Sequence, residues 1–323
     1  ILEVEEEDDE LEAAVTYDIA SYPSDLTLSV VYEMFKNGDI IIPDYQRNFV
    51  WSIKQSSLLI ESFLIGLPVP QVFFYVNEDN KNEVIDGLQG LNAGSPVAKK
   101  RYEDLTEAQQ RKLKSAVLRA INIRQLHPKD EATSVYHIFE RLNTGGTPLK
   151  PQEIRNCVFR GDLVRILREL NQDANWRKII GKNTFDKHQK DVELILRIFS
   201  LTYSFDDYEK PMKEFLNVVM QREKDGSSKQ VKSFHADFTL VAKKIVELLG
   251  ERPFHIRRPL NSSALDAVFA ALLNRKGNLP ADLADRYTKL KHDESFVNTT
   301  FHSTSDVSVV KKRFEVARTF LVE

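Results

Sequence analysis

The spacing of apolar residues changes part-way along this chain, and this change constrains the fold more than any other feature. Up to about residue 125, short apolar runs bounded by polar turns alternate with amphipathic segments. The runs predict strands at 40–42, 71–76, 83–86 and 117–125. The strands at 71–76 and 83–86 are expected to pair as a hairpin. Helices are expected at 26–37, where Gly38 provides the stop, at 52–66 and at 106–115. From Asp130 onward only the helical period recurs, so the pattern predicts an α+β protein, with a small mixed-sheet domain followed by an all-α domain.

The boundary between these two domains is expected near Gly161. Pro151 opens a helix at the position where a proline costs no hydrogen bond, and further amphipathic segments follow it. They are predicted at 162–172, 190–204, 211–222, 234–250, 262–274, 280–290 and 306–321. The chain is therefore expected to divide into a tail at 1–22, an α/β domain at 23–160 and a helical domain at 161–323.

The start of the chain is strongly acidic. Eight of its first twelve residues are acids, namely Glu3, Glu5, Glu6, Glu7, Asp8, Asp9, Glu10 and Glu12. The simplest interpretation is a flexible, solvated tail, and the alternative is a nucleic-acid mimic that screens a basic groove. Without these acids the chain carries 45 basic and 40 acidic residues, so its charge permits DNA binding without requiring it.

The composition is that of an ordinary soluble protein, 42% hydrophobic and 29% charged. No apolar run approaches the roughly 20 residues that span a bilayer, and no signal peptide is visible at residue 1. A single cysteine, Cys157, excludes an intrachain disulfide and fits a reducing compartment. We therefore expect a cytoplasmic protein without a membrane partner, in which Cys157 is a small buried residue.

Two short motifs place polar groups directly after apolar runs. The run that ends in Asp86-Gly87 is typical of a strand that stops at a sharp turn, where glycine permits a positive φ. The run 40–42 leads into Tyr45-Gln46-Arg47. Brought together, they would supply an arginine fork, backbone N–H donors and a carboxylate, which suit a phosphate ester. The plainer alternative for Asp86 is an Asx turn that closes a strand.

These segments also carry a family resemblance. In order, the chain reads IPDYQRNFVW, SIKQSSLLIESFLIGLPVPQVFFY, EVIDGLQ and FERLNTGGTPLKPQEIRN. The series closely resembles the N-terminal domain of GmrS/GmrD-type type IV restriction proteins, which is similar to the ParB/sulfiredoxin-like superfamily, over about residues 26–160. The resemblance implies a domain of a prokaryotic anti-phage system that binds and hydrolyses a nucleoside triphosphate with Mg²⁺. It also implies coupling to DNA sensing or to a nuclease partner.

The resemblance assigns roles to individual residues. Arg47 would grip the phosphates, Gln46 would orient a water molecule, and Asp86 would hold Mg²⁺ or water. The other nucleotide-binding residues that it implies are Tyr45, Gly87, Gln89, Arg141, Asn143, Thr144, Arg155 and Asn156. Residues 139–149 are otherwise a helix end and a connection, and an arginine on a helix is more often solvated or salt-bridged.

One position departs from the family pattern. The family continues its Asp-Gly motif with Gln-Arg and a helix, whereas Gln89 is followed by Gly90 and no helical pattern appears before Pro96. Either a stretch is absent between Gln89 and Gly90, or a true deletion has left a binding-only relic. The first is favoured, because a deletion would also remove the helix whose N-terminus should face the phosphate.

Several chemistries are set aside by the sequence. It contains no G-x-x-x-x-G-K-[ST] loop, no C-x-x-C pair and no H-x-x-x-H spacing, and nothing in it resembles a histidine-asparagine-histidine nuclease module. Among the basic clusters, Lys311, Lys312 and Arg313 are candidates for DNA contact. Two alternatives to hydrolysis stay open. One is a DNA-binding or adaptor subunit with a degenerate nucleotide site, and the other is a ParB-like DNA nickase. The nucleotide, the partner and the oligomeric state also stay open.

Overall fold

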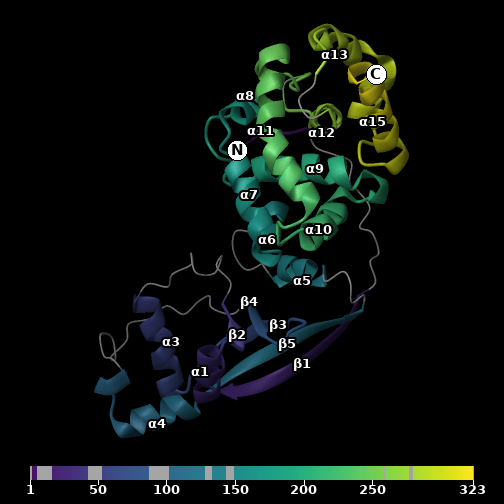
Figure 1. Cartoon of the computed structure of the whole chain (residues 1–323). Coiled ribbons are helices and arrows are strands. Elements are labelled where there is room, and N and C mark those ends of the chain that lie inside the picture. The colour runs from purple at the N-terminus through teal and green to yellow at the C-terminus, as the bar shows by residue number, and fades with distance from the viewer. Residues whose placement is uncertain are drawn as a thin grey trace. The chain divides into compact units, whose positions relative to one another are not determined.

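The computed structural model divides into two compact units (Figure 1). The α/β unit is Thr16–Pro148, and the helical unit comprises Ile1–Val15 with Leu149–Glu323. The structure describes residues 2–5, 17–42, 53–86, 102–127, 133–142, 149–257, 259–275 and 279–322. No helix in these ranges is long and apolar enough to cross a membrane.

The α/β unit is built on a five-stranded mixed sheet with the order β1-β5-β3-β4-β2. The strands are β1 (Asp18–Thr27), β2 (Ile40–Ile41), β3 (Val72–Val76), β4 (Asn82–Asp86) and β5 (Val117–His127). β1 pairs antiparallel with β5 and β3 antiparallel with β4, whereas β3 pairs parallel with β5 and β2 parallel with β4. The α+β prediction is confirmed, and so is the strand pairing of 71–76 with 83–86.

Helices α1 (Leu28–Asn37), α3 (Ile53–Ile65), α4 (Glu107–Ser115) and α5 (Ser134–Leu142) accompany the sheet. Val31 and Met34 of α1 pack on a core cluster of the sheet, which consists of Ile40, Val72, Phe74, Val84 and Ala120. The Thr27 side chain caps α1 by accepting the N–H of Val30, and Gly38 ends the helix at a φ of 78°. The glycine stop expected there is confirmed.

The first strand differs from the sequence prediction. Residues 1–22 were expected as a tail, but β1 begins at Asp18 and pairs with β5 along its whole length. No residue of β1 is fully buried, so the strand lacks the apolar alternation by which strands are predicted. β1 is therefore held as the outer strand by its backbone pairing with β5, and not by burial of its side chains.

The helical unit begins earlier than predicted, at Leu149 instead of near Gly161. Its helices are α6 (Pro151–Val158), α7 (Asp162–Leu170), α8 (Ala174–Ile180), α9 (Lys190–Tyr203), α10 (Met212–Arg222), α11 (Lys229–Leu249), α12 (Ser262–Leu273), α13 (Leu283–His292), α14 (Glu294–Phe301) and α15 (Val307–Leu321). The boundary moves because α6 contacts α9 and α10. Short α8 and α14 were not predicted, since one or two turns carry little periodic signal.

Three buried ion pairs fasten the central helix α9 to its neighbours. Both α9, from Asp191 to Leu201, and the whole of α12 are buried. The pairs are Asp191 with Arg177 of α8 at 2.8 Å, Glu193 with Arg155 of α6 at 2.8 Å, and Arg197 with Asp266 of α12 at 2.5 Å. Because each charge is buried beside its partner, these pairs tie the positions of the four helices to one another.

The carboxylate of Glu193 makes stability depend on pH. Burial raises its pKa, but Lys190 and Arg155 outweigh burial and lower it from 4.5 to about 2. A depressed folded-state pKa contributes stability that is complete above the unfolded pKa and is lost as the pH falls from about 4.5 towards about 2, on the order of 3 kcal/mol in total. We expect urea unfolding followed by circular dichroism to show this loss. Glu193→Gln should flatten the pH dependence, and an unchanged slope would contradict the assignment.

Candidate functional site

The strands bring the chain after β2 and the chain after β4 to the same end of the sheet, which is the edge formed by the strand termini and not by an outer strand. β2 and β4 are parallel neighbours, with Ile40 opposite Asn82 and Ile41 opposite Glu83. Parallel neighbours end at a common edge, where α/β sheets tend to bind ligands. The predicted Tyr45, Gln46, Arg47, Gly87 and Gln89 lie outside the described residues, and only the backbone of Asp86 is described.

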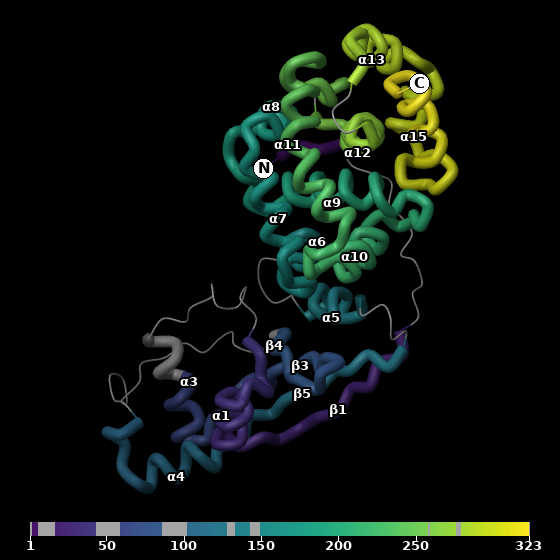
Figure 2. The backbone as a smooth tube through the Cα atoms, viewed as in Figure 1, coloured from purple at the N-terminus to yellow at the C-terminus, as the bar shows by residue number. Residues whose placement is uncertain are grey.

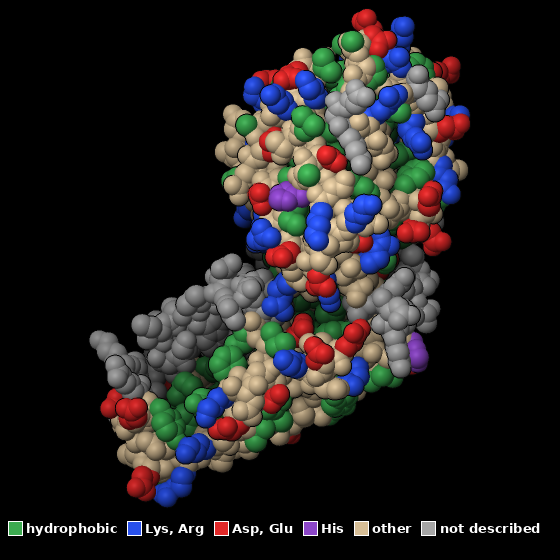
Figure 3. Space-filling model, in the orientation of Figure 1, with side chains coloured by type: hydrophobic (Ala, Val, Ile, Leu, Met, Phe, Trp, Pro, Cys, Tyr) green, Lys and Arg blue, Asp and Glu red, His purple; other side chains and the backbone are tan. Residues whose placement is uncertain are grey.

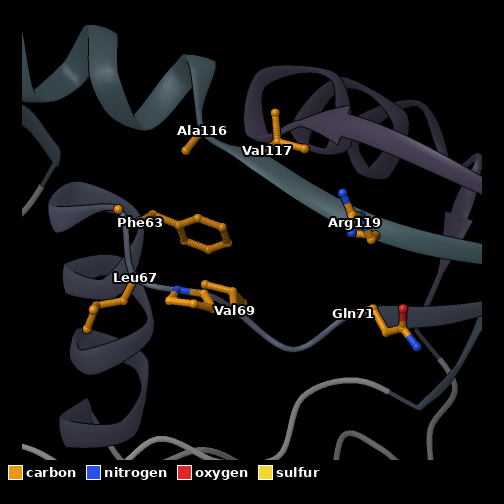
Figure 4. A pocket seen from close by; sticks show the side chains of 9 residues that line it. Phe63, Leu67, Val69, Gln71, Ala116, Val117 and Arg119 are labelled. Carbon is orange, nitrogen blue, oxygen red and sulfur yellow. The ribbon is translucent and has the colours of Figure 1, made fainter.

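A cavity of about 510 Å³ opens at this same edge of the sheet (Figure 4). Its lining comes from the end of α3, the connection to β3 and the start of β5, namely Phe63, Gly66, Leu67, Pro68, Val69, Gln71, Ala116, Val117 and Arg119. Because β3 runs antiparallel to β4, its start lies beside the end of β4, where Phe73 pairs with Asp86. The cavity therefore lies at the sheet edge to which the Asp86 motif leads.

The cavity is lined by apolar side chains and by two longer polar side chains, and its polar and apolar surfaces are of similar size. Phe63 is buried, whereas Leu67 and Val117 are about half exposed. Arg119 donates from Nε to Oδ1 of Asp25 on β1 at 3.1 Å, which holds its guanidinium at the cavity. Gln71 supplies an amide from the start of β3. A cavity of this size is typical of small-molecule sites.

The sequence motifs did not single out Arg119 or Gln71. Each stands near the start of a predicted strand, in runs 117–125 and 71–76. Val72 lies opposite Ala120 in the parallel pair of β3 and β5, so Gln71 and Arg119 precede opposed residues. Nothing in the sequence states that these strands are neighbours, and a polar residue at a strand start is too common to be a signal.

The family segment that contains Asn143 and Thr144 is a third motif, and it follows α5. Helix α5 contacts β4. Tyr136 and Phe139 of α5 are buried. The side chain of Gln125 on β5 accepts the N–H of Ser134 at 3.2 Å, which holds the start of the helix. Arg141 lies exposed in its last turn. Asn143 and Thr144 lie outside the described residues. The three elements that precede the motifs, β2, β4 and α5, all belong to the α/β unit.

Residues 30–160 match the family model described as the GmrSD restriction endonuclease, N-terminal domain. This chain carries a GmrSD domain. The match begins within α1 and ends just past α6, so it contains the sheet edge and the motifs that suggested the family. The GmrSD domain indicates a component of a restriction or anti-phage system. Comparisons with curated proteins and with solved structures gave no match.

Arg155, although within the GmrSD match, is placed in the helical unit with Asn156. Its side chain is 1% exposed. The guanidinium donates to Glu193 at 2.8 Å, Asn217 at 2.8 Å, Gln152 at 3.2 Å and the carbonyl of Lys213 at 3.1 Å. Asn156 is also buried, bonded to Gln152 and Gln189. These contacts stabilise the packing of α6 on α9 and α10, and they give both residues a structural role in place of the expected nucleotide contact.

Outside the GmrSD domain, the basic cluster on α15 is divided by the turn of the helix. Lys311 and Lys312 are exposed, but Arg313 is fully buried and donates to the carbonyls of Thr299 at 2.6 Å and Thr304 at 3.1 Å. Arg313 is therefore withdrawn as a candidate for DNA contact. On the face shown in Figure 3, basic and acidic side chains of the helical unit are interspersed.

The Mg²⁺ site was expected at Asp86, whose side chain lies outside the described part of the structure. Among the residues that the structure describes, no group of three or more His, Cys, Asp or Glu side chains is placed to hold a metal ion. A carboxylate at a strand end is a suitable oxygen ligand for Mg²⁺, which usually takes one or two protein carboxylates together with phosphate oxygens.

Cys157 is buried as expected, and burial followed by the charge of Glu153 raises its pKa to about 12, which leaves the thiol unreactive.

Proposed function

We propose that this chain binds and hydrolyses a nucleoside triphosphate at the sheet edge where β2 and β4 end. The main support for the proposal is the parallel pairing of β2 with β4, because the Arg47 motif and the Asp86 motif therefore both begin at the same end of the sheet. A cavity of about 510 Å³ opens at that end. Arg47 binds the phosphates, Asp86 holds Mg²⁺ or the attacking water, and Gln46 orients that water. Tyr45, Gly87, Gln89 and Arg141 complete the nucleotide-binding site, in which Asn143 and Thr144 contact the base or ribose.

Phosphoryl transfer depends on positioning and on charge neutralisation, and both suit this set of residues. The planar guanidinium of Arg47 can take two phosphate oxygens at once. Gly87 lets backbone N–H groups approach the phosphate chain closely. Bound Mg²⁺ supplies the remaining positive charge. The carboxylate of Asp86 and the amide of Gln46 would hold the water for in-line attack on the terminal phosphorus, as the bond from that phosphorus to the departing nucleoside diphosphate breaks.

We assign the cavity to the base or ribose of the nucleotide. Phe63 and Val117 offer apolar surface, while Arg119 and Gln71 offer hydrogen-bonding groups. Arg119→Ala is expected to weaken nucleotide binding about tenfold, because the variant loses a charged hydrogen bond to the base or ribose. Isothermal titration with each nucleotide measures the change.

The matched control for Arg119 is Arg111→Ala, which removes an exposed arginine from α4 in the same unit. It should leave the nucleotide affinity unchanged. A similar loss in both variants would attribute the effect to net charge, and no loss in Arg119→Ala would remove the cavity from the nucleotide site.

In a restriction system, hydrolysis would serve DNA sensing by the helical unit or a nuclease partner in the cytoplasm. One observation favours a second function: Gly90 stands where the family pattern has arginine, as a degenerate site in an adaptor subunit would show. Phosphate release from GTP, CTP, UTP and ATP with Mg²⁺, with and without DNA, separates the two. Release from any of them supports hydrolysis, binding without release identifies the adaptor, and absence of binding overturns both proposals.

A further inference from the structure

Residues 2–5 lie as an extended segment against the helical unit, on a surface formed by Asp186, Leu260 and Asn261 that we call the groove. Val4 forms a parallel bridge with Leu260, directly before α12. The N–H of Leu260 donates to the carbonyl of Glu3 at 3.2 Å, and the N–H of Glu5 donates to the carbonyl of Leu260 at 3.0 Å. Figure 2 shows this N-terminal segment running beside α12. The segment is therefore joined to the helical unit by a single β-bridge and the backbone hydrogen bonds on either side of it.

Side chains hold both ends of the same segment. Leu2 is buried, and its N–H donates to the carboxylate of Asp186 at 2.6 Å. At the other end, the amide of Asn261 donates to the carboxylate of Glu5, and the positive charge of Arg257 also acts on it. The groove thus contacts a buried apolar side chain at one position and a carboxylate three positions later.

Two residues that bind the segment, Asp186 and Asn261, also stabilise the starts of helices. Asp186 also accepts the N–H groups of His188 at 2.9 Å and Lys190 at 3.3 Å, at the start of α9. Asn261 caps α12 by accepting the N–H of Ala264 at 2.7 Å. Asp186 and Asn261 therefore hold the starts of α9 and α12 as well as the two ends of the segment.

We propose that this groove is a peptide-binding site, and that residues 2–5 are its ligand, held within the same chain and able to detach. Backbone pairing with a pocket for selected side chains is how proteins bind extended peptides. One buried leucine and a few hydrogen bonds must offset the cost of ordering four residues, so the segment leaves and returns readily. The ligand class is an extended peptide with an apolar residue and a carboxylate three positions after it.

Binding of a fluorescent peptide with the sequence ILEVEEED tests this proposal by anisotropy. The attached segment competes at a high effective concentration, so the intact chain should bind the peptide at least about tenfold more weakly than a Leu2→Asp chain. Glu5→Pro, which removes the N–H that bonds to Leu260, should open the groove in the same way. Glu3→Gln is the matched control, because the Glu3 side chain is exposed, and it should behave as the intact chain.

A peptide with Leu2→Asp should bind none of these chains. If ILEVEEED binds the intact chain and both variants equally, it binds elsewhere and the proposal is overturned. If it binds neither variant while circular dichroism shows native helix content, the groove is not a peptide site. Should Leu2→Asp fail to fold, Glu5→Pro decides between these results.

Discussion

Asp86→Asn and Arg47→Ala are each expected to lower the rate of nucleotide hydrolysis by roughly 10²–10³-fold, the loss typical when one group that stabilises transition-state charge is removed. In the proposed site, Asp86→Asn removes the negative charge that would hold Mg²⁺ or water at the end of β4. Arg47→Ala removes the guanidinium, so the affinity for nucleotide should fall as well. Single-turnover phosphate release measures the rate, and titration without turnover measures the affinity.

Two control variants leave the sheet edge untouched. Asp79→Asn changes an exposed acid in the turn between β3 and β4, which lies at the opposite edge of the sheet from the end of β4. Arg111→Ala removes an exposed arginine on α4. Both should hydrolyse nucleotide at the rate of the unaltered chain. If Asp86→Asn and Arg47→Ala also keep that rate, the assigned roles are wrong, even though the family assignment stands.

Asp266→Ala is expected to destabilise the helical unit by about 3–5 kcal/mol, because it leaves a buried charge without its partner. Asp266 is fully buried on α12, and its Oδ2 accepts Nε of Arg197 at 3.0 Å and Nη2 at 2.5 Å. The alanine variant leaves the Arg197 guanidinium of α9 in the core without this carboxylate. Urea unfolding followed by circular dichroism measures the free energy of unfolding.

Burial can be separated from ion pairing by two comparisons. Glu107→Ala breaks the exposed pair with Arg111 and should cost less than about 1 kcal/mol. The double replacement Arg197→Met with Asp266→Leu should recover part of the loss, since a buried ion pair can be replaced by apolar side chains of similar volume. If Asp266→Ala costs no more than Glu107→Ala, the pair does not stabilise the contact between α9 and α12.

Local patterns were sufficient for most helices and strands. The amphipathic period placed α9 and α12 within one or two residues of their observed ends, and Gly38 ends α1 as its position predicted. Strand β1 could not be found in this way, because backbone pairing with β5 holds it while none of its residues is fully buried. The acidic start was expected to be solvated along its whole length, yet Leu2 is buried by contacts with residues that lie far along the chain.

The sequence by itself determined the α+β order of elements, the family and the motifs that end at Arg47 and Asp86, because each is written in consecutive residues. Only the tertiary structure decided which side chains are available to a ligand. Lys312 and Arg313 are adjacent, but a helix turns by about 100° per residue, so one faces solvent and the other the core. Likewise, Gln71 and Arg119 line one cavity because β3 pairs with β5. Such pairing depends on residues distant in the chain, which no local pattern records.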